Sequence, residues 1–210
     1  METKNVLHFK ILFILLLKCN IFSAQVPAFG KCPEVDVAVG DNFDLEKYVG
    51  LWYEAEKYPF VFEVGGKCIT ATYGKMENGD VSVVNRQINR FTGNEGKVSG
   101  SATIVSPGKL SVRFNSLPSP ASNFEANYWI LDTDYSTFAV VYSCRDLGGL
   151  MSGKMVWILT REQNPDLETL KKAYAVLDRN KITKAYLLRT DQFNCNTETG
   201  TDSLKDEVFL

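Results

Sequence analysis

The stretch NFDLEKYVGLWY, from Asn42 to Tyr53, places a helix start, a helix end and the beginning of a strand within one short run. The side chain of Asn42 or Asp44 can accept hydrogen bonds from the first N–H groups of a short helix. Gly50 suits the end of that helix, where the backbone often needs a positive φ. Trp52 and Tyr53 then begin a strand. This order indicates a short helix that closes one end of a β structure, although any helix-to-strand junction has similar parts.

Residues 1–24 are predicted to be a secretory signal peptide. Lys4 and Lys10 give a basic start, residues 11–17 are an unbroken apolar run, and Ser23-Ala24 offers small residues for cleavage. The apolar run is too short to span a bilayer. We therefore expect a secreted, extracellular protein whose fold begins after this segment.

The charge and histidine content exclude several classes of function. Loss of the signal peptide removes three lysines and one glutamate, which takes the formal net charge from −2 to −4. The basic residues are spread along the chain, so nucleic acid is not expected as a partner. The single histidine, His8, also leaves with the signal. We therefore expect no Ser-His-Asp catalysis, no histidine-ligated metal and no histidine-bound haem.

Four cysteines follow the signal peptide: Cys32, Cys68, Cys144 and Cys195. An even number in a secreted chain favours two disulfides. Their spacing leaves all three pairings open. A zinc site is disfavoured because no two of the four lie close together in the sequence.

Short segments with strand character fill the middle of the chain. Residues 69–73 alternate apolar and polar side chains, and Asn78-Gly79 after them is a strong hairpin signal. Similar segments recur at nearly regular spacing up to Thr160, which gives about eight strands with hairpin-type connections. We expect an antiparallel sheet, either a sandwich or an up-and-down barrel.

The sequence period changes after the strands. Asn164 as cap and Pro165 as first residue predict a helix start. An apolar stripe at helical spacing follows, formed by Leu167, Leu170, Tyr174 and Leu177. The stripe should dock on the outer face of the sheet, for which the candidates are Trp129, Leu131, Val156 and Ile158.

A last short strand is predicted at residues 185–188, and the polar tail at residues 196–210 is predicted to be disordered. We find no internal repeat and no second domain. The chain therefore reads as a signal peptide at 1–24, one domain at 25–195 and a tail.

Several motifs in this order resemble the lipocalin family, within it the apolipoprotein D-like branch with the insect Lazarillo and bilin-binding proteins. Asn42 to Tyr53 matches the first family motif, Thr133-Asp134-Tyr135 the second, and Arg161 the third. Gly66-Lys67-Cys68 and Tyr142-Ser143-Cys144 are among further matches to that branch. The resemblance implies an all-β fold, an eight-stranded antiparallel up-and-down barrel with one C-terminal α-helix packed outside.

The resemblance also assigns structural roles. It implies the disulfides Cys32–Cys144 and Cys68–Cys195. It further implies that Trp52 stacks on Arg161 in a cation–π contact at the closed end, so neither residue is expected to bind ligand.

Strand alternation and the resemblance together predict the residues that line the barrel interior. Positions that match pocket residues of the apolipoprotein D-like branch are Tyr73, Asn85, Tyr128 and Trp157. Alternation adds Phe114, Val112, Tyr142, Met155 and Leu159 to the ligand-binding set. The other interpretation of each position is an ordinary inward-facing core residue that does not contact a ligand. The faces of Glu54 and Glu56 stay unassigned, because both share the nominal face of Trp52 and a bulge is expected there.

The resulting prediction is a secreted carrier that binds a fatty acid, sterol, retinoid or bilin inside the barrel, in lipid transport and stress protection. No cofactor is required, although a bound lipid or bilin chromophore fits the prediction. An enzyme is not expected, because the thiol that some lipocalins use is committed to disulfides here. The alternative is surface recognition, in which the loop Arg145–Ser152 contacts a membrane, a lipoprotein or a protein partner at the barrel mouth.

Overall fold

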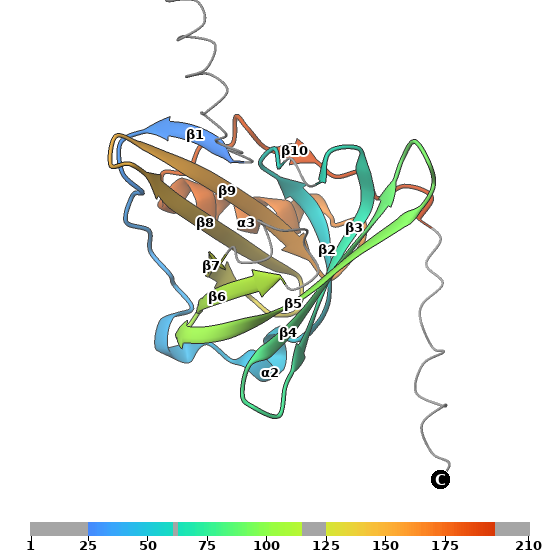
Figure 1. Cartoon of the computed structure of the whole chain (residues 1–210), viewed down its shortest axis with the longest axis horizontal. Coiled ribbons are helices and arrows are strands. Elements are labelled where there is room, and N and C mark those ends of the chain that lie inside the picture. Colours follow the sequence, from blue (N-terminus) through green and yellow to red (C-terminus); the bar gives the residue numbers. More distant parts are fainter. Residues whose placement is uncertain (1–24, 61–62, 115–124, 196–210) are drawn as a thin grey trace, which may run out of the picture.

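The computed structural model describes residues 25–60, 63–114 and 125–195. Within them, strands β2 to β9 each pair antiparallel with the next, and β9 pairs with β2, so the sheet closes into an eight-stranded barrel (Figure 1). Closure in one sheet excludes the sandwich. The barrel strands are β2 (Gly50–Lys57), β3 (Gly66–Lys75), β4 (Val81–Asn89), β5 (Glu95–Ser106), β6 (Lys109–Phe114), β7 (Glu125–Thr133), β8 (Phe138–Leu147) and β9 (Met151–Thr160).

Three predicted segments lie outside the described residues. They are the signal peptide at 1–24, the proline-containing loop at 116–124 and the polar tail at 196–210. These assignments stay predictions.

One end of the barrel is closed by the chain that enters it. The turn η1 (Gly40–Asn42) and helix α2 (Leu45–Tyr48) lie at the lower end in Figure 1, and β1 (Val26–Phe29) lies at the opposite end, paired with the start of β9. The helix cap is Asp44, not Asn42, because its carboxylate accepts the Lys47 N–H at 3.3 Å. Gly50 has a φ of +101°, as its place after the helix predicted.

Helix α3 (Leu167–Arg179) packs on the outside of the barrel against β8 and β7. Its cap is Asp166, whose carboxylate accepts the Thr169 N–H at 2.7 Å, so the predicted cap at Asn164 was wrong. Of the predicted stripe, Leu170, Tyr174 and Leu177 contact the outer cluster, whereas Leu167, the first residue of the helix, is exposed. Ala173, Val176 and Leu177 are the residues that α3 buries.

The outer surface beneath α3 is a hydrophobic cluster of its own. It contains Leu131, Val156 and Ile158, with Trp129 packed against it, which confirms the docking surface that the sequence indicated. The other cluster lies inside the barrel, so the two faces of the sheet contact different partners.

Strand β2 contains the expected irregularity, with a register shift between Glu54 and Glu56 against β9. Its pairing with β3 ends at Tyr53, opposite Thr70. Beyond that point β2 pairs with β10 (Leu188–Arg189), which lies later than the strand predicted at 185–188. The segment from Leu188 to Gln192, here called the C-terminal strap, therefore separates β2 from β3 toward the open end.

Two disulfides tie flanking segments to the barrel. Cys32–Cys144 joins the segment before the barrel to β8, and Cys68–Cys195 joins β3 to the residues after the strap. These are the pairings that the family resemblance implied.

Candidate ligand-binding site

Arg161 holds the closed end together. Its guanidinium lies 3.7 Å from the centre of the Trp52 ring, which confirms the expected cation–π contact. The same group donates hydrogen bonds to the carbonyls of Lys47, Tyr48, Val49, Leu51 and Tyr135, at 2.7–3.2 Å. Carbonyls at the end of α2 have no partner within so short a helix, so Arg161 satisfies them.

Above this closure, three tyrosines from separate elements form a chain of hydroxyls. The Tyr128 hydroxyl lies 2.8 Å from that of Tyr48 and 2.7 Å from that of Tyr73. Burial raises the pKa of all three phenols above the ordinary value, so they stay neutral near pH 7. Tyr48 was not predicted as a site residue, although its place in the closing helix was a signal for it.

Asn85 faces the interior from β4. It lies on the same strand face as Val81 and Val83, both of which belong to the inner cluster. Its Oδ1 atom is buried and has no hydrogen-bond partner among the described residues. An unpaired buried amide oxygen costs free energy, so a polar ligand group or a water molecule at this position would stabilise the protein.

Of the remaining predicted positions, all except Tyr142 lie on the inner face of the barrel. Val112 and Leu159 belong to the inner cluster, Phe114 and Trp157 pack against it, and Met155 shares the face of Trp157 by alternation on β9. The ring of Phe60, from the connection after β2, meets Trp157 edge-on at 6.2 Å.

Tyr142 does not line the interior, and its prediction as a ligand residue was wrong. It lies in the outer cluster with Phe138 and Val140, and its ring contacts that of Trp129 at 6.3 Å. Every residue from Phe138 to Cys144 is buried, so this strand has no polar face that would reveal which side points inward. The structure instead places Ala139 and Val141 inside.

Sequence reasoning missed a buried charged cluster, which we define as Glu54, Lys57 and Glu63. The Lys57 ammonium lies 2.9 Å from a Glu54 carboxylate oxygen and 2.5 Å from one of Glu63. The side chains are 10%, 3% and 15% exposed for Lys57, Glu54 and Glu63. Lys57 pairs directly with Trp157 across the sheet, and directly opposed residues share a face, so the cluster borders the interior.

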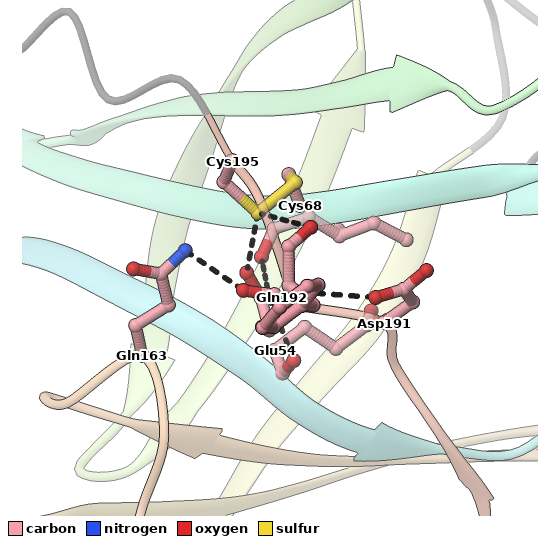
Figure 2. The surroundings of a disulfide bond; sticks show 8 residues. Glu54, Cys68, Gln163, Asp191, Gln192 and Cys195 are labelled. Atoms are coloured by element: carbon pink, nitrogen blue, oxygen red, sulfur yellow. Dashed lines mark hydrogen bonds between the residues drawn. A yellow bond between two sulfur atoms is a disulfide. The ribbon is translucent and has the colours of Figure 1, made fainter.

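The strap completes the barrel wall next to this cluster. The Gln192 side-chain amide donates to the Glu54 carbonyl at 3.0 Å and to the Ile69 carbonyl at 2.8 Å, so it bridges β2 and β3 (Figure 2). The Thr190 hydroxyl donates to the Glu54 carboxylate at 2.5 Å. Figure 2 also shows the Cys68–Cys195 disulfide beside Gln192, so this part of the wall is covalently secured.

A groove of about 400 Å³ lies outside the barrel, between the β9–α3 connection and the strap. Its lining includes Gln163, Pro165, Leu170, Arg189 and Phe193. In the described part of the chain, no group of three or more His, Cys, Asp or Glu side chains is placed to hold a metal ion. None of the described helices has the length and hydropathy needed to cross a bilayer.

Comparisons with known proteins agree with this architecture. The family model described as "Lipocalin-like domain" matches residues 43–192. Apolipoprotein D of Cavia porcellus is 43% identical over 171 residues, covering 80% of this chain and 85% of that protein. The Lazarillo protein of Schistocerca americana is 36% identical over 155 residues, 69% of this chain and 70% of the relative. The bilin-binding protein of Pieris brassicae is 33% identical over 142 residues, with coverage of 67% and 72%.

Solved structures show the same fold. Insecticyanin from the tobacco hornworm Manduca sexta superposes with a TM-score of 0.67 at 25% identity, covering 80% of this chain and 89% of that one. Lobster apocrustacyanin A1 superposes with a TM-score of 0.68 at 23% identity, covering 79% and 91%. The chain therefore belongs to the lipocalin family, in the branch that contains apolipoprotein D.

Proposed function

We propose that the protein is a secreted carrier that holds one small hydrophobic molecule inside its barrel. The observation that carries this proposal is the composition of the inner face. Apolar and aromatic side chains surround a few polar groups there, and the Asn85 Oδ1 atom is left without a partner among the described residues. Ligand pockets typically combine an apolar lining with a few fixed polar groups.

The two halves of the interior suggest how a ligand would be oriented. Trp157 and Phe114, toward the open end, offer flat apolar area, and the phenols of Tyr73 and Tyr128 lie toward the closed end. Burial of apolar ligand area is worth about 25 cal/mol per Å² before the cost of ordering the ligand. Sterols, retinoids, fatty acids and bilins, the last in view of the bilin-binding relative, are the ligand classes that fit. Lipid transport and stress protection are the roles we propose for such a carrier.

The test is a tryptophan-fluorescence titration with cholesterol, retinol, hexadecanoate and biliverdin. Trp157 packs against the inner cluster and Trp129 against the outer one, so the two serve as matched probes. We expect quenching to persist in Trp129→Phe and to be strongly reduced in Trp157→Phe, where Trp52 is the interior tryptophan that remains. Failure of every ligand to quench the unmodified protein or to raise its melting temperature would contradict the proposal.

A second function, contact with a lipid surface through the barrel mouth, has its own support. The end opposite α2 exposes large apolar side chains, with Phe29 93%, Phe91 82%, Leu150 80% and Val64 76% exposed. Phe29 and Leu150 lie on adjoining segments, because Phe29 pairs with Met151 and the Gly30 N–H donates to the Leu150 carbonyl at 2.8 Å. Several exposed apolar residues at one end are typical of an interaction surface.

Liposome flotation tests this second function. We expect Leu150→Asp to reduce flotation with phosphatidylcholine vesicles. Leu167→Asp is the matched control, because Leu167 is also an exposed leucine, 66% accessible, but lies at the start of α3. Equal flotation of the two variants and the unmodified protein would exclude the mouth as a lipid contact.

A further inference from the structure

The buried charged cluster contains more acid than base. Two carboxyl groups, those of Glu54 and Glu63, contact the one ammonium of Lys57. The Thr190 hydroxyl also donates to Glu54. With both acids ionised the cluster would carry one uncompensated negative charge in a place that water hardly reaches. Such a charge is costly unless a proton or another cation neutralises it.

Among the described residues, the neighbouring charged side chains named here do not supply that cation. On β2, Glu56 lies on the outer face, where its carboxylate accepts the Tyr174 hydroxyl at 2.8 Å. Arg189 of the strap lines the outer groove. On β4 and β6, Arg86 and Arg113 form exposed ion pairs with Glu95 and Glu125. From the interior, Trp157 lies opposite Lys57 in the sheet, and the charge of Glu54 adds to the effect of burial in raising the pKa of the Tyr73 phenol.

We propose that this cluster selects the polar end of the ligand, so that the interior prefers ligands with a neutral or cationic polar end to the corresponding carboxylates. This inference rests on the proposed carrier function and narrows its ligand class. A ligand amine would provide the missing positive charge. A ligand carboxylate would add a third acid, so it would bind only after taking up a proton from solution.

The state of Glu63 supports the inference. Its burial, followed by the negative charge of Glu54, raises its pKa to about 8, against the opposing pull of Lys57. At neutral pH the Glu63 carboxyl therefore holds a proton, and the cluster is neutral. Binding of an ammonium group would release that proton, whereas binding of an alcohol would leave it in place.

Isothermal titration calorimetry at pH 7 in two buffers of different ionisation enthalpy tests the inference. The ligands are dodecylamine, dodecanol and dodecanoate, each below its aggregation concentration, so that only the polar end differs. We expect dodecylamine to release close to one proton, dodecanol none, and dodecanoate to take one up. Dodecanoate should bind at least about tenfold more weakly than dodecylamine. A tenfold change in affinity is the same free energy as a shift of one pKa unit.

Two variants separate the cluster from other acids. Glu63→Gln should abolish proton release by dodecylamine and narrow the gap between amine and carboxylate. Glu56→Gln removes the same charge from the outer face of the same strand and should bind like the unmodified protein. The calorimetry on the unmodified protein stands even where a variant folds poorly.

The outcomes distinguish this inference from the proposed function. If none of the three ligands binds, the carrier function itself is contradicted. If all three bind with equal affinity and no proton exchange, or if dodecanoate binds most tightly without proton uptake, the selection inference fails and the carrier function stands.

Discussion

The closed end and the open half of the barrel differ in how their polar groups are paired. At the closed end, Arg161 satisfies the carbonyls that end α2, and Tyr48 and Tyr73 bond to Tyr128. In the open half, β2 leaves β3, the strap fills the gap, and acids outnumber bases behind it. The polar groups of the closed end are therefore paired within the protein and stabilise the fold, whereas the open half contains the charged cluster that we propose contacts the ligand.

The largest expected effect comes from releasing the strap. The double variant Cys68→Ser and Cys195→Ser opens a loop with a sequence separation of 127 residues and should lower the free energy of unfolding by about 4 kcal/mol. Chemical denaturation measures the loss. The amide of Thr190, which donates to the Ala55 carbonyl, should also lose protection from hydrogen exchange.

The other disulfide provides the control for that prediction. Loss of Cys32–Cys144 should lower stability by a comparable amount, since its sequence separation is 112 residues. It should leave exchange at Thr190 unchanged. Equal protection of Thr190 in both double variants would show that the open half does not depend on the strap.

Loss of Arg161 tests the closed end directly. Arg161→Met removes the stacking on Trp52 and leaves carbonyls at the end of α2 without donors, so we expect a loss of about 3 kcal/mol in urea unfolding. Arg179→Met is the control, because its ion pairs with Asp36 and Asp132 lie on the surface and should contribute less than about 1 kcal/mol. Similar losses for both arginines would contradict the role assigned to the closed end.

The pH dependence of stability probes the open half. The folded state raises the pKa of Glu63 from 4.5 to about 8, mainly through burial, so the folded protein holds this proton more tightly than the unfolded chain does. The stabilisation is present at acidic pH and is lost as the pH rises through that window. Glu63→Gln should therefore match the unmodified protein near pH 5 and exceed its stability near pH 8 by on the order of 2 kcal/mol.

Thermal unfolding across this range provides the measurement. Glu56→Gln, on the outer face, should follow the pH profile of the unmodified protein. If the stability of Glu63→Gln depends on pH as that of the unmodified protein does, the raised pKa of Glu63 is contradicted.

The smallest effect concerns single hydroxyls. Tyr128→Phe removes the partner shared by Tyr48 and Tyr73 and should cost about 1 kcal/mol. Tyr142→Phe is the matched change outside the barrel. Its hydroxyl is buried with no hydrogen-bond partner among the described residues, so its removal should cost nothing. A larger loss from Tyr142→Phe in thermal unfolding would contradict the assignment of the two faces.

Local patterns were a good guide wherever alternation could be counted from a residue whose side was already indicated. The docking surface of α3 at Leu131, Val156 and Ile158 was predictable, because alternation from the expected interior residues Tyr128 and Trp157 places it on the outer face. The pattern failed on β8, where both faces are buried and no residue indicated the inward side. That failure misplaced Tyr142. The helix start was also displaced, since Asp166 competes with Asn164 for the same capping role.

The order of strands and helices, the cysteine content and the closing motif could be read from the residues alone, because they depend on side-chain periodicity and on local backbone preferences. Which faces point inward, and the bridge that Gln192 makes between β2 and β3, followed only from the folded barrel. The contact of Lys57 with Glu54 and Glu63 likewise followed only from the fold. The bulge in β2 and the strap from the far end of the chain shape the part of the barrel wall where these three side chains lie. Contacts between residues so distant along the chain have no periodic signal, because they depend on how the closed barrel brings its strands together.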